Sequence, residues 1–282
     1  MFRNSNFTSI SFSNIFDQKM ISKNSIKLIK SLANKKNRIK ENLFLVEGDK
    51  MVAEVLDSNF VVDKLYVTNA FIIMNKPKIK NEKITIKVTR EDINKTSLMK
   101  NPQNSIALCT LPAEKDLPKK IDSDLSIYLD EIQDPGNLGT IIRICDWFGI
   151  DHLFCSPKTA DLYNPKVIQS TMGSFCRVNV YYTAFEPVAE LASKSEVTVL
   201  GAFLDGVNIY TQKFPSRILL VMGNEGNGIS PEVEKIVEKR IKIPEFNKNA
   251  KSAESLNVSV ATAIICAEFK RKTHVAGLLE MK

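Results

Sequence analysis

The sequence lacks any long apolar run, which argues against a chain built around membrane-spanning helices. A helix that crosses a bilayer needs roughly 18 to 20 apolar residues in succession, and no stretch approaches that length. Residues 1–19 interleave Asn, Ser and Phe and do not form the continuous apolar segment of a signal peptide. We therefore expect a cytoplasmic protein in which residues 1–19 form an N-terminal extension.

The sequence is also poor in the residues that build disulfide frameworks and zinc sites. It has two histidines and five cysteines, and no C-x-x-C motif occurs. The cysteines are scattered along the chain, at Cys109, Cys145, Cys155, Cys176 and Cys266. Because disulfide frameworks and Cys/His zinc sites need paired or closely spaced ligands, we expect neither, and we expect no metal in the functional site.

An excess of positive charge is present. The 39 Lys and Arg residues outnumber the 32 Asp and Glu residues, which gives a net charge of +7. Much of the excess lies near the start, at Lys19, Lys23, Lys27, Lys30, Lys35, Lys36, Arg38 and Lys40. Such a cluster favours a polyanionic partner, because binding to phosphates releases condensed counterions. The alternative is a solvated helix face, which a lysine run alone fits better.

The length of 282 residues suits two domains, since one hydrophobic core usually serves about 100 to 200 residues. Residues 20–112 predict a small mixed α/β domain, with helices near 20–33 and 49–56 and strands near 42–48, 64–68 and 84–88. Residues 113–124 are rich in Pro, Lys and Asp, which is typical of a linker. The second domain is expected at 125–282.

The second domain alternates short apolar strands with helices. Strands are predicted near 125–129, 152–155, 197–203, 218–222 and 241–243, and helices are predicted to begin near residues 138, 165, 231 and 256. This alternation predicts a parallel sheet covered by helices on both faces. Ligands of such sheets bind outside the carboxyl ends of the strands, so a site is expected in the loops that follow the strands.

The first of these loops contains one residue that does not suit an apolar helix. Asn137 is a suitable N-cap, and Gly149 a suitable end, for a helix with an apolar side. Arg143 lies in its second turn, where an unpaired buried charge would be strongly unfavourable. Arg143 therefore either pairs with a neighbour such as Asp146 or faces a polar cleft, and this loop alone slightly favours the pair.

The second loop, residues 223–228, has three glycines, which let the backbone approach a ligand closely. Ser230 and Pro231 then follow the usual order at the start of a helix. The loop is neither G-x-G-x-x-G nor Walker A, and a simple tight turn explains it equally well. In the third loop, Ser255 can cap a helix whose first turn contains Asn257, and free N–H groups there can hold an oxygen-rich group.

Taken in order, the three loops resemble the three motifs of the SpoU/TrmH family of SPOUT RNA methyltransferases. The motifs are N-x-G-x-x-x-R at 137–143, G-N-E-G-x-G at 223–228 and S-L-N-V-S-V-A at 255–261, an ordered set that chance would rarely give. The resemblance covers about residues 125–269. It implies S-adenosyl-L-methionine as cofactor, a homodimer with the active site near the interface, and a deep trefoil knot in the C-terminal part of the sheet.

The first domain is similar, more weakly, to the ribosomal-protein-like substrate-binding domain of the same family. The similarity lies in Arg38, in Leu-Phe-Leu-Val-Glu-Gly at 43–48 and in Glu54. It implies that residues 20–112 bind the RNA substrate. Because family members that act on tRNA often lack such a domain, rRNA is favoured over tRNA.

The resemblance also implies roles for eight residues. By motif position, the catalytic and RNA-positioning residues are Asn137, Arg143, Glu225, Ser255 and Asn257. The residues expected to contact the cofactor, largely through backbone groups, are Gly223, Ile243 and Leu256. The 2′-hydroxyl is a poor nucleophile, so we expect Arg143 to stabilise the developing negative charge, as an electrostatic partner or as the proton acceptor. The electrostatic role is the easier one, because a free arginine remains protonated far above neutral pH.

Two further segments of the second domain bear on the cofactor pocket and on RNA contacts. The loop from Ile243 to Ser255 is longer and more polar than the compact, glycine-containing loop typical of the family, and it includes Lys248 and Lys251. The helix predicted near residue 165 fits the family's region of similar position, and its Lys166 and Ser170 are candidate RNA contacts.

The sequence therefore predicts S-adenosyl-L-methionine-dependent 2′-O-ribose methylation of structured RNA. A non-catalytic RNA-binding protein on the same fold is one alternative, which loss of Asn137, Arg143 or Ser255 would have favoured, but all three are present. A nicotinamide-dependent reductase is another. The absent G-x-G-x-x-G motif argues against it, as do Arg240 and Lys242 where an acidic ribose ligand would be expected.

Overall fold

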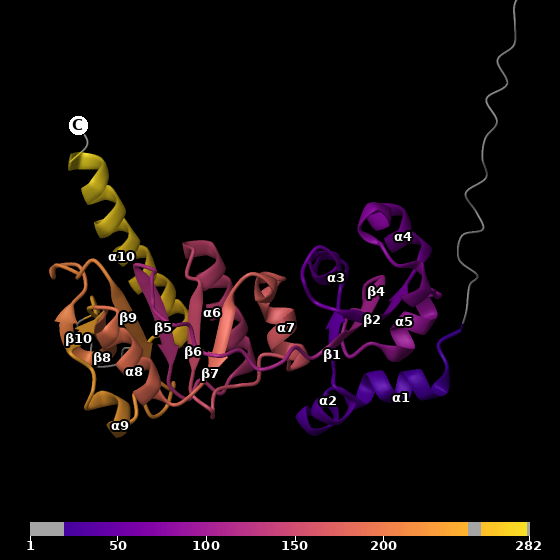
Figure 1. The fold of residues 1–282 in the computed structure, drawn as a ribbon, viewed down its shortest axis with the longest axis horizontal. Coiled ribbons are helices and arrows are strands. Elements are labelled where there is room, and N and C mark those ends of the chain that lie inside the picture. Colours follow the sequence, from indigo (N-terminus) through magenta and orange to yellow (C-terminus); the bar gives the residue numbers. More distant parts are fainter. Residues whose placement is uncertain (1–19, 248–254, 281–282) are drawn as a thin grey trace, which may run out of the picture.

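Two β-sheets lie side by side along the length of the molecule, each with its own helices (Figure 1). The structure is a computed structural model that describes residues 20–247 and 255–280. The N-terminal extension expected at 1–19, and Lys248 and Lys251 in the long loop, lie outside the described residues.

The N-terminal unit is a mixed four-stranded sheet with short helices. Its strands follow the order β1-β4-β2-β3, and only the β2–β3 pair is parallel. The elements are α1 (Lys23–Ser31), α2 (Lys35–Glu41), β1 (Leu43–Glu47), α3 (Asp49–Leu56), β2 (Val62–Val67), α4 (Asn69–Asn75), η1 (Lys76–Lys78), η2 (Glu82–Ile84), β3 (Thr85–Lys87), α5 (Arg90–Thr96) and β4 (Ser105–Thr110). The small mixed α/β unit expected from the sequence is confirmed.

Strand β1 is buried on both faces because successive side chains point to opposite sides of a sheet. Phe44 and Val46 join a core that continues into the second unit. Leu45, between them, packs with Ile29 and Leu32 in a separate core beneath α1. The apolar run Leu-Phe-Leu-Val therefore serves two cores at once.

The C-terminal unit is a six-stranded sheet in which every pair is parallel, in the order β10-β8-β9-β5-β6-β7. Its elements are β5 (Leu125–Leu129), α6 (Pro135–Phe148), β6 (His152–Cys155), α7 (Pro165–Thr171), η3 (Ser174–Cys176), β7 (Asn179–Tyr182), α8 (Phe185–Lys194), β8 (Thr198–Asn208), β9 (Ile218–Met222), α9 (Pro231–Glu234), β10 (Lys239–Lys242) and α10 (Val258–Glu280). The predicted parallel sheet is confirmed.

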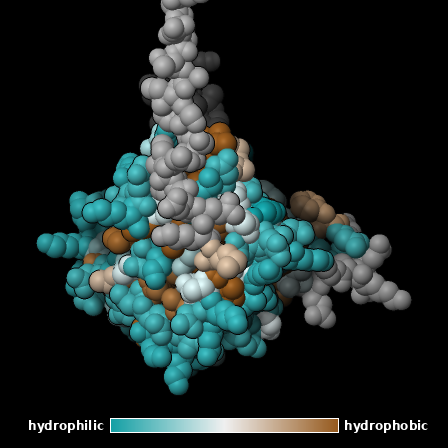
Figure 2. Space-filling model, turned by 90° about the vertical axis from the view of Figure 1, so that its right-hand side faces the viewer, coloured by the Kyte–Doolittle hydropathy of each residue, from teal (hydrophilic) through white to brown (hydrophobic). Residues whose placement is uncertain are grey.

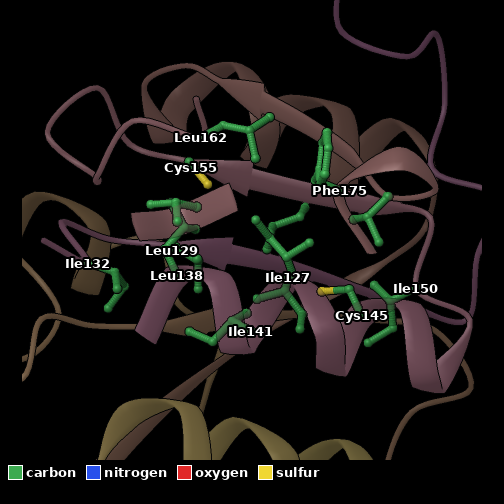
Figure 3. Close-up of a cluster of buried hydrophobic side chains, with 14 of the residues drawn as sticks. Ile127, Leu129, Ile132, Leu138, Ile141, Cys145, Ile150, Cys155, Leu162 and Phe175 are labelled. Atoms are coloured by element: carbon green, nitrogen blue, oxygen red, sulfur yellow. The ribbon is translucent and has the colours of Figure 1, made fainter. Parts of the chain in front are cut away.

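Helices cover both faces of this sheet, as the continuous apolar strands require. Ile127 and Leu129 of β5 point into a core formed with Leu138, Ile141 and other residues of α6 (Figure 3). The alternate β5 residue, Tyr128, faces a second core with α8 and α9. Helices α7 and α10 complete the first of these faces.

Several elements escaped the sequence prediction. Helices α2, α4, α5 and α8 and strands β4 and β7 were not expected, and β8 extends to Asn208, well beyond the predicted end. Strand β7 has only four residues, and α8 begins without a side-chain cap. The helix predicted from Pro231 is a single turn, α9. The four residues of β7 and the single turn of α9 carry little periodic signal. Helix α8 does bury residues at helical spacing, Phe185, Val188, Leu191 and Ala192, but it lacks a capping residue that would mark its start.

Aromatic rings join the two units. Phe44 of β1 lies 4.7 Å from Tyr163 and 6.4 Å from Phe175 between ring centroids, and Phe60 lies 5.4 Å from Phe175. Phe44 and Phe60 belong to the N-terminal unit, whereas Tyr163 and Phe175 belong to the C-terminal one. Because one apolar core spans the junction, the two units are packed against each other as parts of a single body.

Two arginine ion pairs also cross the junction. Arg38, only 2% exposed, lies 2.5 Å from Asp161 and donates to the carbonyl oxygens of Leu32 and Ala33. The sequence analysis grouped Arg38 with the lysines of a basic, solvated surface. That prediction is wrong, because Arg38 is buried. A buried guanidinium must be paired, and its partner here stands 123 positions further along the chain.

The second ion pair involves Arg177, which follows η3. Its guanidinium contacts Glu54 of α3 at 2.5 Å and Asp146 of α6 at 2.8 Å. Partial burial opposes ionisation of Asp146, but the hydrogen bonds from Arg177 prevail and hold the pKa of that carboxyl below its usual range. Glu54, noted in the sequence as a family feature, therefore ties the N-terminal unit to the second sheet.

The structure also bears on the cysteines, on metal binding and on membrane-spanning helices. All five cysteines are free thiols, and four of them are buried. Within residues 20–247 and 255–280, no cluster of His, Cys, Asp or Glu is arranged to hold a metal ion. None of the described helices is both long and apolar enough to cross a membrane.

Replacing Arg38 tests the junction. Arg38→Met removes the buried cation and leaves Asp161 and two carbonyl groups without their donor. We expect the free energy of unfolding to fall by about 3 kcal/mol, the order seen when one partner of a buried pair is removed. Denaturant unfolding measures the change. Lys194→Met, which breaks an exposed pair with Glu190, should leave stability nearly unchanged, and equal stability of both variants would contradict the role of Arg38.

Candidate active site

The three loops singled out in the sequence meet at one edge of the second sheet. Strands β5 and β9 are adjacent, with Leu129 opposite Met222, so the segments that follow them leave the sheet side by side. Helix α6 begins after β5, and it packs against α10, whose start carries the third motif. The fold therefore gathers the motifs at the carboxyl edge, where the sequence placed them.

Asn137 connects the three motifs through its side-chain amide. Its Nδ2 donates to Glu225 Oε1 of the glycine loop at 2.5 Å, and its Oδ1 accepts from Asn257 Nδ2 at 2.9 Å. An amide can do both because it carries a donor and an acceptor group. Asn137, Glu225 and Asn257, which lie far apart in the sequence, thus form one hydrogen-bonded chain.

Two predicted helix caps are wrong. Asp134, not Asn137, is the N-cap of α6: its carboxylate accepts from the N–H of Asn137, and Pro135 occupies the first helical position. Asn257, not Ser255, caps α10, because its Oδ1 accepts from the N–H groups of Ser259 and Val260. Ser255 is exposed and lies before the helix. The predicted end of α6 at Gly149 is confirmed by its left-handed φ of 64°.

The glycine loop is closed on itself. The N–H of Asn224 donates to the carbonyl of Gly228 and the reverse bond is also made, both at 2.9 Å. A Cβ on Gly223 would lie 2.3 Å from the backbone of Gly228. No side chain fits there, so Gly223 is required by the loop's own backbone whether or not a ligand is bound.

Residues that the sequence analysis missed hold this loop against β5. Asn224 Nδ2 donates to the carbonyl of Glu131 at 2.8 Å, and the carboxylate of Asp130, only 3% exposed, accepts from the N–H of Ser230 at 2.7 Å. Asp130 and Glu131 directly follow β5. Both residues position the glycine loop. Their sequence signal was the presence of acidic residues directly after a buried strand.

The motif glycine of α6 allows two helices to approach closely. A Cβ on Gly139 would lie 2.4 Å from the Cβ of Ser170 and 2.8 Å from the carbonyl oxygen of Val167, both in α7. Glycine is therefore needed where α7 crosses α6. Ser170 lies at this helix contact, and its hydroxyl donates to the carbonyl of Lys166.

Arg143 is exposed on α6 and is free to meet a ligand. In the part of the chain that the structure describes, its guanidinium has no hydrogen-bond or ion-pair partner. The alternative of a pair with Asp146 is wrong, because Asp146 accepts three hydrogen bonds from Arg177. Arg143 also lies one helical turn before Trp147, whose side chain is 84% exposed.

The fold and this site define an α/β protein whose motifs converge at the carboxyl edge of a parallel sheet, behind a smaller mixed α/β unit. Comparison with known families agrees for each part. Residues 124–267 match the SpoU rRNA methylase family, and residues 23–107 match the MRM3-like substrate-binding domain. The chain belongs to the SpoU rRNA methylase family.

Individual relatives extend over nearly the whole chain. The 23S rRNA (guanosine(2553)-2′-O)-methyltransferase of Bacillus subtilis is 32% identical over 84% of this chain and 92% of its own length. A solved TrmH-family protein from Porphyromonas gingivalis is 37% identical, with a TM-score of 0.78 over 90% of this chain and all of its own. An rRNA methyltransferase from Sinorhizobium meliloti, solved with S-adenosylmethionine bound, is 26% identical, with a TM-score of 0.79 over 91% of this chain and 98% of its own.

The residues predicted to contact the cofactor suit S-adenosyl-L-methionine. Gly223 follows β9, Ile243 follows β10, and Leu256 precedes α10. Leu256 is 49% exposed and Ile243 is half-buried against the core, so both have apolar surface that is not fully covered by the described residues. No hydrogen bond joins these three residues to one another among the described parts of the chain.

The link through Asn137 can be tested by changing one atom. Asn137→Asp keeps the shape but puts an oxygen against Glu225 in place of the donor. We expect methyl transfer to fall about 10- to 100-fold, since a hydrogen bond to a charged group contributes about 1.5 to 3 kcal/mol. The assay is transfer of a labelled methyl group to RNA. Asn227→Asp adds the same charge to the glycine loop that contains Glu225 and should have little effect. Full activity of Asn137→Asp would show that the link is dispensable.

Proposed function

We propose that this protein transfers a methyl group from S-adenosyl-L-methionine to a ribose 2′-hydroxyl of ribosomal RNA. The observation that carries the proposal is the hydrogen-bonded chain from Glu225 through Asn137 to Asn257, with Arg143 unpaired on the same helix as Asn137. The similarity to the Bacillus subtilis 23S rRNA enzyme over nearly its full length supports ribosomal RNA over tRNA. All catalytic motif residues are present, which argues against a non-catalytic RNA-binding role.

Methyl transfer would exchange a carbon–sulfur bond of the cofactor for a carbon–oxygen bond at the 2′-oxygen, and the hydroxyl proton would pass to water. S-Adenosyl-L-methionine supplies an electrophilic methyl group when bound. Arg143 stabilises the negative charge that develops on the 2′-oxygen, with the neighbouring phosphate as a further contact. Asn137 and Asn257 are held in fixed orientation by their mutual hydrogen bond and orient the ribose. Ser255, exposed two residues before Asn257, is proposed to donate to the same nucleotide.

Cofactor binding is assigned to the segments around Gly223, Ile243 and Leu256, and these segments are proposed to form a trefoil knot. Two observations support the knot. Strand β10 lies at one edge of the sheet, separated from β9 by β8. Helix α10, which comes next in the sequence, packs against α6 near the middle of the sheet. A C-terminal segment that passes from an edge strand back to a helix near the middle of the sheet is what a trefoil knot requires.

The first unit is proposed to bind the RNA. The lysines of α1 and α2, including Lys23, Lys27, Lys30, Lys35 and Lys36, are exposed. Figure 2 looks at this end of the molecule and shows a mainly hydrophilic surface with scattered hydrophobic residues. A polar, basic surface suits phosphate contacts, which position RNA without reading its sequence.

The division into an extension (1–19), an RNA-binding domain (20–112), a linker (113–124) and a catalytic domain (125–282) stays a prediction. Residues 111–124 contain no helix or strand, which supports the linker. The cytoplasmic location likewise stays a prediction.

A homodimer is proposed through the exposed face of α6 and the start of α10. Trp147 is 84% exposed, and Leu256 and Val260 are 49% and 48% exposed. Trp147 lies on α6 and Val260 on α10, two helices that pack together, and Leu256 lies just before α10. Arg143 is on the same face of α6 as Trp147, because residues four apart in a helix share a face. Dimerisation would therefore bring Arg143 to an interface.

Replacing Arg143 tests the catalytic proposal. Arg143→Ala should lower methyl transfer to rRNA by about 100-fold or more, as removal of a single charge-stabilising group does in other enzymes. S-Adenosyl-L-methionine binding, measured by calorimetry, should be unchanged. Separated rRNA and tRNA serve as substrates, and the methylated ribose is then mapped. Label found only on bases or protein, or normal turnover by Arg143→Ala, would overturn the assignment.

Replacing Trp147 tests the dimer. Trp147→Glu places a charge on the exposed apolar face and should convert the dimer to a monomer in sedimentation velocity, with a loss of methyl transfer. Leu204→Glu is the matched control, since Leu204 is 76% exposed on β8, away from α6. A parent protein that sediments as a monomer, or a Trp147→Glu variant that stays dimeric, would contradict this interface.

A further inference from the structure

A cavity of about 320 Å³ lies between the two units, beside the start of α6. The N-terminal unit contributes β1, α3 and the segment after α5, and the C-terminal unit contributes Pro135 and the start of α7. Figure 1 shows β1, α3 and α7 next to one another at this junction. The volume is at the lower end of the range for small-molecule sites, about 300 to 1,000 Å³.

The inner wall of the cavity is apolar and buried. Leu45, Met51 and Ile168 line it and are 1%, 5% and 1% exposed. Leu98, Met99 and Pro135 form the more accessible side. A slot walled by apolar side chains suits a flat ring that has been taken out of a base stack, as in pockets that receive unstacked or flipped bases.

One carboxylate, Glu47, stands in this apolar wall. It is 6% exposed, and its Oε1 accepts from the Ser97 hydroxyl and from the N–H of Leu98 at 3.1 Å. Its Oε2 receives only a longer bond, 3.3 Å, from the same Leu98 N–H. A carboxylate has about four acceptor positions. Glu47 Oε2 therefore has unused capacity in a place where an unsatisfied buried charge is unfavourable.

Polar side chains lie at the mouth of the cavity. Lys166 and Gln169 are exposed on α7 and line it. Asn164 uses its Oδ1 to cap α7 by accepting from the N–H of Lys166, which leaves its Nδ2 as a donor. The cavity thus combines one deep acceptor with donors at the rim.

We propose that this cavity binds one unpaired guanine base of the RNA substrate, an inference that rests on the function proposed above. Guanine presents two adjacent donors, N1–H and the 2-amino group, to the acceptor capacity of Glu47. Its O6 faces the rim donors of Lys166 or Asn164. Adenine, cytosine and uracil each lack this pair of adjacent donors. Pro135 lies two residues before Asn137, so the base is held next to the catalytic residues.

The first experiment reads the cavity directly. Methyl groups of methionine are labelled with ¹³C in the full-length protein, and GMP, AMP, CMP and UMP are titrated separately. The Met51 and Met99 signals, assigned by Met→Leu substitutions, should shift with GMP and respond much less to the other three. Glu47→Gln, which presents an amide to the guanine donors, should abolish this preference. No shift, or equal shifts with all four nucleotides, would overturn the proposal.

The second experiment measures methylation of rRNA. Met99→Trp fills the cavity and should raise KM for rRNA about tenfold, the discrimination expected for one good base contact, with unchanged cofactor binding. Met74→Trp is the control, because Met74 is 64% exposed on α4 and outside the cavity. Gln169→Ala should give a smaller increase in KM. Unchanged KM in Met99→Trp would overturn the proposal.

The two experiments separate failure of the cavity from failure of the proposed function. If rRNA is methylated but the Met51 and Met99 signals ignore GMP, only the cavity assignment is wrong. If no RNA is methylated while these signals select GMP, the cavity remains a guanine site and the methyltransferase assignment fails.

Discussion

A single amide side chain holds the candidate active site together. Asn137 donates to Glu225 and accepts from Asn257, and these bonds connect loops that leave the sheet after β5, after β9 and before α10. Asp could not donate, and Ser is too short to reach both partners, so the position requires a side chain with both functions at its end. The strand order of the sheet brings the loops near one another. The two hydrogen bonds of the Asn137 side chain then fix their relative positions.

The junction between the two units is a second constraint, because it packs them against each other as one body. Aromatic packing around Phe44 and Phe175 supplies an apolar core, while Arg38 and Arg177 supply ion pairs at its edges. Ion pairs alone contribute little when exposed, but Arg38 is buried and its pairing depends on the geometry of both units. RNA bound to the first unit would therefore be presented to the second at a fixed distance.

Much of the second domain could be predicted because its strands are short, apolar and regularly spaced. Strands β5, β6 and β9 fall at their expected bounds, and helix α7 begins at the expected residue. The misplaced caps of α6 and α10 have one cause: Asn137, Ser255 and Asn257 are all good capping residues, and sequence alone does not say which one meets the free N–H groups. The pairs Arg38–Asp161 and Arg177–Glu54 were beyond prediction, since each bridges 123 positions.

The same long-range pairing explains why Arg143 is available for chemistry. On the sequence, Asp146 is its natural partner, three residues away in one helix. In the fold, Asp146 instead accepts three hydrogen bonds from Arg177, and Arg143 remains exposed. At the proposed dimer interface, a guanidinium would interact more strongly with negative charge, because a partner subunit and RNA would exclude water. It can then stabilise negative charge without losing its own proton, so the electrostatic role needs nothing beyond what the fold already provides.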